Sequence, residues 1–116
     1  MENKQVGRIG EDIATDFLRK LHFKIIGRNV IRAGVEADIL AEDGKCVVIV
    51  EVKTKTSDEY GLPQEMVGPA KQHQLIRFAK SYLSEYGEVA IRIDVVAVTL
   101  TNDEPVIEHL KNCVGE

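Results

Sequence analysis

The stretch that decides the fold is Cys46 to Lys55, which reads CVVIVEVKTK. Valine and isoleucine dominate it, and such a run is typical of a strand covered on both faces of a central sheet. Because side chains alternate along a strand, Glu51 and Lys53 are expected to share one face of it. Burying a charge is costly unless the charge is paired or bound to a metal. We therefore expect any chemistry of this chain to lie at Glu51 and Lys53.

A second strand and a tight turn precede this stretch. Val35 to Glu42 (VEADILAE) alternates between apolar and other residues, and the Asp43-Gly44 pair that follows is typical of a two-residue hairpin loop. Alternation places the even-numbered residues of this strand on one face and the odd-numbered residues on the other. A loop at Asp43-Gly44 sets Asp38 opposite Ile49, within diagonal reach of Glu51. The hairpin is therefore expected to bring two carboxylates together.

The remaining elements follow from apolar periodicity and from turn residues. Apolar side chains at spacings of three and four predict amphipathic helices over about residues 4–22 and 69–86, the second ended by Gly87. Strands are expected over about residues 22–32 (bulged near Gly27), 91–100 and 106–110. Residues 56–68 have no period, and a loop this long is more often functional than idle. The expected order is α-β-β-β-α-β-β.

Length and composition are those of one small protein domain. The 116 residues, 44% of them hydrophobic and 29% charged, suffice for a single domain over residues 1–116 with one ordinary core. No apolar run approaches the roughly 18 residues of a membrane span, and the polar start, MENKQVGRIGED, is unlike a secretory signal. Two cysteines far apart, Cys46 and Cys113, favour reduced thiols, so we expect a cytoplasmic protein with no membrane partner.

The net charge argues against a protein that coats nucleic-acid backbone regardless of sequence. The chain carries −4 and its pI is near 5.4, whereas such binders are usually basic. The charge is uneven, however: residues 1–32 hold seven Lys or Arg and four Asp or Glu, whereas residues 33–66 hold three and eight. This pattern suits a carboxylate metal site flanked by phosphate contacts. It equally suits an ordinary uneven surface, and composition does not separate the two.

The strongest constellation is Asp38 followed, thirteen residues later, by Glu51-Val52-Lys53. Mg²⁺ or Mn²⁺ prefers oxygen ligands, which the carboxylates of Asp38 and Glu51 and the backbone carbonyl of Val52 can supply. A bound ion could activate water and neutralise charge on a phosphate, and Lys53 could hold the water or the phosphate. The pattern Asp…Glu-x-Lys is that of metal-dependent nucleases.

Charged residues on the flanking elements could complete such a site. Glu11 lies at the edge of the apolar stripe of the first helix, where it can reach the sheet; the alternative is a solvated position on the helix flank. Lys71 is in line with the buried row of the second helix and is expected to project inward; the alternative is a side chain that extends to water. Candidate contacts to nucleic-acid phosphates are Arg8, Arg28, Arg32 and Lys71.

Several stretches together resemble the YraN-like family of uncharacterised bacterial proteins, within the restriction-endonuclease-like nuclease fold, and more distantly the archaeal Holliday-junction resolvases. The matching stretches are Gly10-Glu11 with Ala14, Glu36 to Ala41, Val50 to Lys55, Gly61 to Pro63, Lys71, and Arg92 to Val96. The resemblance implies an α/β fold, with a central mixed five-stranded sheet flanked by helices. It also implies a divalent-metal site in which Asp38 and Glu51 bind the ion, Lys53 is the catalytic lysine and Glu11 is a further acidic group.

The residues and the resemblance together favour one function. We expect an endonuclease that uses Mg²⁺ or Mn²⁺ to hydrolyse phosphodiesters of DNA rather than RNA, on branched or damaged DNA. A two-fold homodimer would place two such sites on a symmetric substrate. Two alternatives remain open. One is a nucleic-acid-binding accessory protein of the same fold without turnover, and the other is a purely structural ion pair between Glu51 and Lys53.

Overall fold

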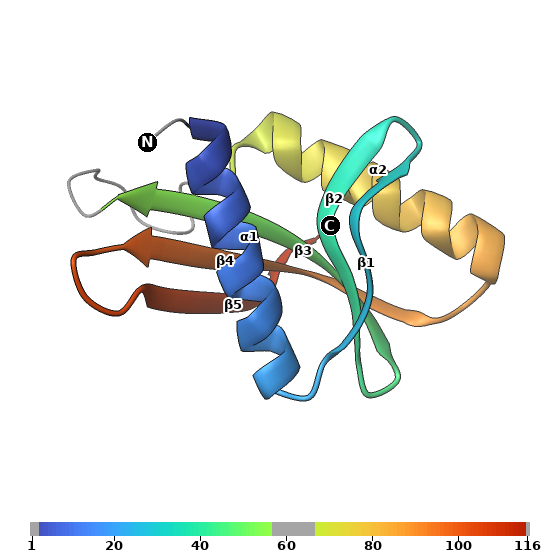
Figure 1. Ribbon diagram of the computed structural model, residues 1–116. Coiled ribbons are helices and arrows are strands. Elements are labelled where there is room, and N and C mark those ends of the chain that lie inside the picture. The colour runs from blue at the N-terminus through green and yellow to red at the C-terminus, as the bar shows by residue number, and fades with distance from the viewer. Residues whose placement is uncertain (1–2, 57–66, 116) are drawn as a thin grey trace.

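The computed structural model describes residues 3–56 and 67–115, and its elements follow the expected order. They are α1 (Asn3–Lys20), β1 (Lys24–Arg32), β2 (Val35–Asp43), β3 (Cys46–Thr56), α2 (Pro69–Tyr86), β4 (Ala90–Leu100) and β5 (Val106–Val114). The described strands form a five-stranded sheet in the order β1-β2-β3-β4-β5, in which β3 and β4 run parallel and all other neighbours antiparallel. Figure 1 shows α1 crossing one face of this sheet and α2 lying on the other. The predicted class, an α/β restriction-endonuclease-like fold with a mixed five-stranded sheet flanked by helices, is confirmed.

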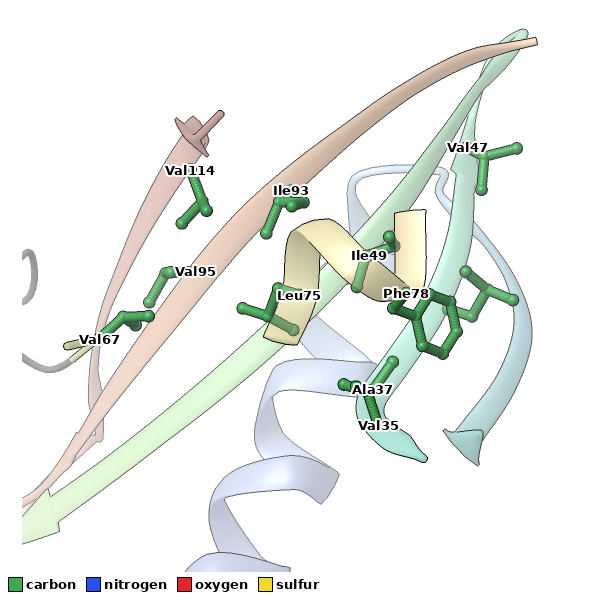
Figure 2. Packing of buried hydrophobic residues seen from close by; sticks show 11 residues of the cluster. Val35, Ala37, Val47, Ile49, Val67, Leu75, Phe78, Ile93, Val95 and Val114 are labelled. Atoms are coloured by element: carbon green, nitrogen blue, oxygen red, sulfur yellow. The ribbon is translucent and has the colours of Figure 1, made fainter. Parts of the chain in front are cut away.

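Two hydrophobic cores hold the helices to the sheet, one on each face. On one face, α2 packs Leu75 and Phe78 against the strands, as Figure 2 shows. On the other face, α1 packs Ala14 and Leu18. The central strand β3 contributes alternate residues to both cores: Val47 and Ile49 to the α2 side, and Val48, Val50 and Val52 to the α1 side. The sequence of β3 correctly predicted a strand that is covered on both faces.

Most element boundaries agree with the sequence analysis. α2 begins at Pro69 and ends before Gly87, whose φ of 82° accompanies an N–H bond to the Leu83 carbonyl at 2.9 Å. β1 carries its predicted bulge, between Ile25 and Gly27. The long loop predicted over residues 56–68 falls mostly outside the described residues. Neither helix within residues 3–56 and 67–115 contains an apolar stretch of the length that spanning a membrane requires.

The hairpin between β2 and β3 differs from its predicted register by two residues. Asp43 pairs with Cys46, so the loop is Gly44-Lys45 rather than Asp43-Gly44. Gly44 has a φ of 60°, and a glycine with positive φ at the first loop position is what a type II′ turn requires. A type I′ loop at Asp43-Gly44 would require a positive φ at Asp43 as well, and Asp43 does not have one. The predicted pairing was therefore wrong.

The predicted alternation along β2 is also wrong beyond Asp38. Val35 and Ala37 lie in the α2 core, whereas Ile39 and Ala41 lie in the α1 core. The paired ladder between β2 and β3 extends only as far as Ile39. Figure 1 shows the β1–β2 hairpin curling away from the direction of β3, β4 and β5. Before Asp38 the odd-numbered residues of β2 face α2, and after Asp38 they face α1. This change occurs where the pairing of β2 with β3 ends and the sheet curls.

β5 is longer than the strand predicted over residues 106–110, because it continues past a bulge. Pairing with β4 is regular up to Leu110 and resumes at Val114. Between these residues, the carboxylate of Asp94 accepts the backbone N–H of Asn112 at 2.9 Å, and Asn112 has a φ of 49°. The Asp94 side chain on β4 thus takes the place of a backbone acceptor in the β4–β5 ladder. The sequence of β5 alone gives no sign of this contact.

Candidate functional site

A pocket of about 850 Å³ opens where the C-terminal ends of β3 and β4 meet the first turns of α1. Figure 1 shows these ends at one edge of the molecule. The described residues that line it include Glu11, Asp38, Glu51, Val52 and Lys53, the five residues predicted for catalysis or metal binding. Neutral polar residues in the lining are Asn3, Thr54, Thr56, Thr101 and Asn102. The fold therefore gathers into one hollow the residues that the sequence places on two strands and a helix.

Asp38 is fixed by the backbone of β3. The paired ladder stops at Ile39 and Val50, so Asp38 is next in line to Glu51. Its Oδ2 atom accepts the backbone N–H of Val52 at 2.8 Å. A strand residue directs its N–H and C=O toward the same neighbour, so the Val52 carbonyl is on the Asp38 side of β3. Two carboxylates and one backbone carbonyl therefore converge at the end of this strand.

Glu51 is buried with an incomplete set of partners. Its side chain is 3% exposed, and its Oε2 atom lies 3.4 Å from Nζ of Lys53 and 3.7 Å from Nζ of Lys71. Among the described residues, no group forms a hydrogen bond with Oε1. A buried carboxylate oxygen without a partner is costly, because it has lost its water. Oε1 is therefore an acceptor atom at which a bound cation would be favourable.

Burial and neighbouring negative charge disfavour the ionised forms of Asp38 and Glu11. Burial, followed by the charge of Glu51, raises the pKa of Asp38 from its ordinary value of 3.8 to about 7. Burial, followed by the charge of Asp38, also raises the pKa of Glu11. A divalent cation bound between Asp38 and Glu51 would relieve this repulsion, which supports the same conclusion as the unpartnered oxygen of Glu51.

Glu11 reaches the site because α1 lies directly on β3. A Cβ atom on Gly10 would lie 2.7 Å from Cβ of Thr54, so a larger residue would force the helix away. The adjacent Glu11 accepts a hydrogen bond from Nδ2 of Asn29 at 3.2 Å, and its Oε1 lies 3.7 Å from Nη2 of Arg28. Glu11 is therefore a partly buried pocket residue and not a solvated residue on the helix flank.

Of the predicted phosphate contacts, Lys71 enters the site and Arg32 does not. Lys71 projects inward from the first turn of α2 and reaches Glu51, as its position in the buried row of that helix predicts. Arg32 instead pairs with Glu85 at 2.8 Å, near the other end of α2. Its guanidinium also lies 5.3 Å from the centre of the Tyr82 ring. Partners of its own thus hold Arg32 away from the pocket.

Arg8 and Arg28 lie on the flank of the site. They line a second groove of about 810 Å³ that shares Gly7 and Glu11 with the first pocket. Arg8 is exposed, whereas Arg28 pairs with Asp12 at 2.9 Å. The two hollows therefore meet at Gly7 and Glu11. The four predicted phosphate contacts thus lie in three places: Lys71 beside Glu51, Arg32 beside Glu85, and Arg8 with Arg28 in the second groove.

Asn29 is a residue near the site that the sequence analysis did not single out. It lies in β1 with a φ of 52°, a left-handed conformation that asparagine tolerates better than most residues. Its amide is the hydrogen-bond donor to Glu11. The only available signal was weak, because asparagine is uncommon within strands.

The oxygen atoms of the site fit a magnesium-type cation. No group of three or more His, Cys, Asp or Glu side chains within residues 3–56 and 67–115 is placed to hold a metal ion. Mg²⁺, however, is commonly held by only one or two carboxylates, with water and substrate phosphate as further ligands. Asp38, Glu51 and the Val52 carbonyl match that smaller requirement.

Metal-free protein is expected to lose stability as the pH rises, because of Asp38. Its folded-state pKa of about 7 exceeds the ordinary value of 3.8, so folding favours the protonated form. The resulting penalty is absent below about pH 4, grows between about pH 4 and 7, and is complete above that range. In EDTA at about pH 8, Asp38→Asn should therefore be more stable than the parent by roughly 2–4 kcal/mol.

Urea unfolding followed by circular dichroism across this pH range measures the effect. Asparagine keeps an oxygen that accepts the Val52 N–H, so the substitution removes the charge without removing the hydrogen bond. Asp103→Asn, which neutralises an exposed carboxylate between β4 and β5, is the matched control and should leave the pH slope unchanged. An Asp38→Asn variant that is no more stable than the parent at high pH would contradict the prediction.

Comparison with known proteins places the chain in a family. The model of uncharacterised protein family UPF0102 matches residues 10–98. A UPF0102 protein of Geobacter sulfurreducens is 46% identical over 95% of this chain and 88% of its own length. UPF0102 proteins of Dehalococcoides mccartyi and Flavobacterium johnsoniae are 38% and 37% identical, over 97% and 94% of this chain and 95% and 93% of their own lengths. The chain therefore belongs to the UPF0102 family, in agreement with its YraN-like sequence pattern.

Proposed function

We propose that this protein is a divalent-metal-dependent endonuclease that hydrolyses DNA phosphodiesters, with branched or damaged DNA as its substrate. The observation that carries the proposal is that the partly buried Asp38 and the buried Glu51 lie beside Lys53 in one pocket. A structural ion pair between Glu51 and Lys53 would not explain why a second carboxylate, that of Asp38, lies close enough to Glu51 to feel its charge. It would also not explain why Oε1 of Glu51 lacks a partner in the described chain. A bound cation would account for both features.

Each group at the site would have its own task. Asp38, Glu51 and the Val52 carbonyl would hold Mg²⁺ or Mn²⁺, which when bound lowers the pKa of a water molecule and offsets the charge of a phosphate. Lys53 would hold the attacking water or stabilise the charge that develops on the phosphate. Glu11 would orient water from the α1 side of the pocket, where its raised pKa favours exchange of a proton.

The remaining lining of the pocket suits a sugar-phosphate backbone. Its threonine hydroxyls and asparagine amides can donate hydrogen bonds to phosphate and sugar oxygens, and such contacts position a strand without reading its sequence. The described lining residues include no aromatic side chain on which a base could stack. This composition supports recognition of DNA by its structure rather than by its base sequence.

Cleavage of a set of DNA substrates tests the proposal. Duplex, single-stranded, flap and four-way-junction DNA would be incubated with purified protein in Mg²⁺, Mn²⁺ or EDTA. The parent should cut at least one substrate when metal is present and none in EDTA, leaving a 5′-phosphate. Asp38→Asn should abolish cutting. Glu42→Gln, which neutralises an acid at the other end of β2, should retain it.

The two possible failures have different meanings. Cutting that survives in Asp38→Asn would show that the activity comes from another site or from a contaminating nuclease. Absence of cutting by the parent, combined with retained binding of junction or flap DNA, would favour the accessory nucleic-acid-binding protein over the enzyme.

A further inference from the structure

Glu51 is shared by two ammonium groups that come from different elements. Nζ of Lys53, on β3, and Nζ of Lys71, on α2, lie 3.4 Å and 3.7 Å from the same oxygen atom. The two lysine side chains are 35% and 31% exposed, whereas that of Glu51 is 3% exposed. Lys71 therefore brings positive charge from a second element to the carboxylate at which a cation would bind.

The two lysines balance the charge of the metal-free site. Asp38 and Glu51 are negative when ionised, and Lys53 and Lys71 are positive. Lys71 acts on both carboxylates, because its charge also lowers the pKa of Asp38 against the larger opposing effects of burial and Glu51. A divalent cation at the same carboxylates would add two positive charges, and like charges at such short range repel strongly. Metal binding therefore favours departure of one ammonium group.

Lys71 is the ammonium group that can leave. It lies in the first turn of α2, where the helix macrodipole disfavours a cation, and that turn contains no acidic residue. Its flexible four-carbon stem allows the charged group to move without any change in the helix. Lys53 lies two residues from Glu51 on the central strand, so it stays beside that carboxylate.

We propose that Lys71 is a placeholder for the metal, an inference that rests on the proposed function. In metal-free protein it neutralises Glu51 and so competes with the divalent cation. Once displaced, it binds a phosphate oxygen of the DNA, where the unopposed N-terminal dipole of α2 also favours negative charge. The cation thus frees the ammonium group that the DNA phosphate needs, and the two ligands strengthen each other's binding.

Binding of Mn²⁺ in the absence of DNA tests the competition. Isothermal titration calorimetry would compare the parent with Lys71→Gln, Lys71→Arg and Lys80→Gln, the last removing a charge farther along the same helix. Lys71→Gln should bind Mn²⁺ roughly three- to tenfold more tightly than the parent, because a competing charge is gone. Lys71→Arg, which keeps the charge, and Lys80→Gln should match the parent.

Binding of DNA tests the second half of the exchange. In a Lys53→Ala background, which keeps the metal ligands but is expected to cleave too slowly to consume the substrate during the measurement, fluorescence anisotropy would measure junction or flap binding in Mn²⁺ at several salt concentrations. Adding Lys71→Gln should weaken binding and reduce the slope of log affinity against log salt by about one, the amount expected for one lost phosphate contact. Adding Lys80→Gln should leave both unchanged.

The outcomes separate this inference from the proposed function. If the parent binds Mn²⁺ and cuts DNA, an Mn²⁺ affinity of Lys71→Gln equal to or weaker than the parent's overturns the placeholder role alone. An unchanged salt slope in that variant likewise overturns the phosphate contact. A parent that binds no Mn²⁺ overturns the proposed function, and the inference with it.

Discussion

Replacing Lys53 by alanine is expected to lower the rate of DNA cleavage roughly a hundred- to a thousandfold without unfolding the protein. Lys53 lines the pocket with its ammonium group 3.4 Å from Glu51. In the proposed reaction it acts on charge that develops as the phosphodiester breaks, so its loss should reduce kcat rather than weaken binding of DNA. The side chain is partly exposed, and Lys71 remains beside Glu51, so the variant keeps a neutralised carboxylate and a filled core.

Two further variants show whether the effect belongs to this position. Lys45→Ala removes an ammonium group from the exposed turn before β3 and should cut at the parental rate. Lys53→Arg keeps the charge but replaces a compact ammonium with a planar guanidinium, so it should restore activity only in part. Single-turnover rates on the substrate that the parent cuts best, with thermal unfolding in EDTA, provide the comparison. A folded Lys53→Ala variant that cuts at the parental rate would contradict the role of Lys53.

Sequence analysis succeeded where the chain is regular. A run of Val and Ile that contains one Glu has a simple physical explanation, burial of a strand around one carboxylate, and β3 conforms to it. The alternation along β3 correctly places Glu51 in phase with Val47 and Ile49 of the α2 core. The prediction that Asp38 and Glu51 lie close together was also correct, although the predicted register between β2 and β3 was not. Both the predicted and the observed pairings bring these two residues within reach of each other.

Sequence analysis failed where contacts between distant segments override a local pattern. β2 was expected to alternate without interruption, but Asp38 leaves the ladder and its carboxylate accepts the N–H of Val52. β5 was expected to end at Leu110, but it continues because Asp94 on the neighbouring strand supports the bulge at Asn112. In each case the deciding contact joins a carboxylate on one strand to a backbone N–H on the neighbouring strand. No window of sequence around β2 or β5 contains that information.

Among the buried charged side chains of the described chain, that of Asp94 has the most complete set of partners. Replacing Asp94 is therefore expected to have a large effect on stability. The residue is fully buried, at 0% exposure. Nε and Nη2 of Arg92 donate to it at 3.0 Å and 3.2 Å, Nε2 of His109 lies at 2.8 Å, and the N–H of Asn112 donates at 2.9 Å. Burial alone would raise the pKa of Asp94, but these hydrogen bonds hold it below its ordinary value. The folded protein therefore favours the ionised form.

Asp94→Ala is expected to lower the free energy of unfolding by about 3–5 kcal/mol, because it leaves a partly buried arginine, a histidine and a backbone N–H without their shared acceptor. Small domains are stable by only about 5–15 kcal/mol, so the variant should be near the limit of folding at ambient temperature. Asp94→Asn keeps one acceptor oxygen and should lose less. It is the variant to measure if Asp94→Ala does not fold.

Urea unfolding near neutral pH, where the depressed pKa leaves Asp94 ionised, gives the comparison. Asp43→Asn is the matched control, because Asp43 also contacts Arg92, at 2.9 Å, but its side chain is 37% exposed, and it should cost less than about 1 kcal/mol. Similar losses for Asp94→Ala and Asp43→Asn would contradict a buried network centred on Asp94. Asp94 does not line the pocket of Asp38 and Glu51, so a folded Asp94→Asn variant should still cut DNA. Loss of cleavage in that folded variant would mean that Asp94 acts on the reaction as well as on the sheet.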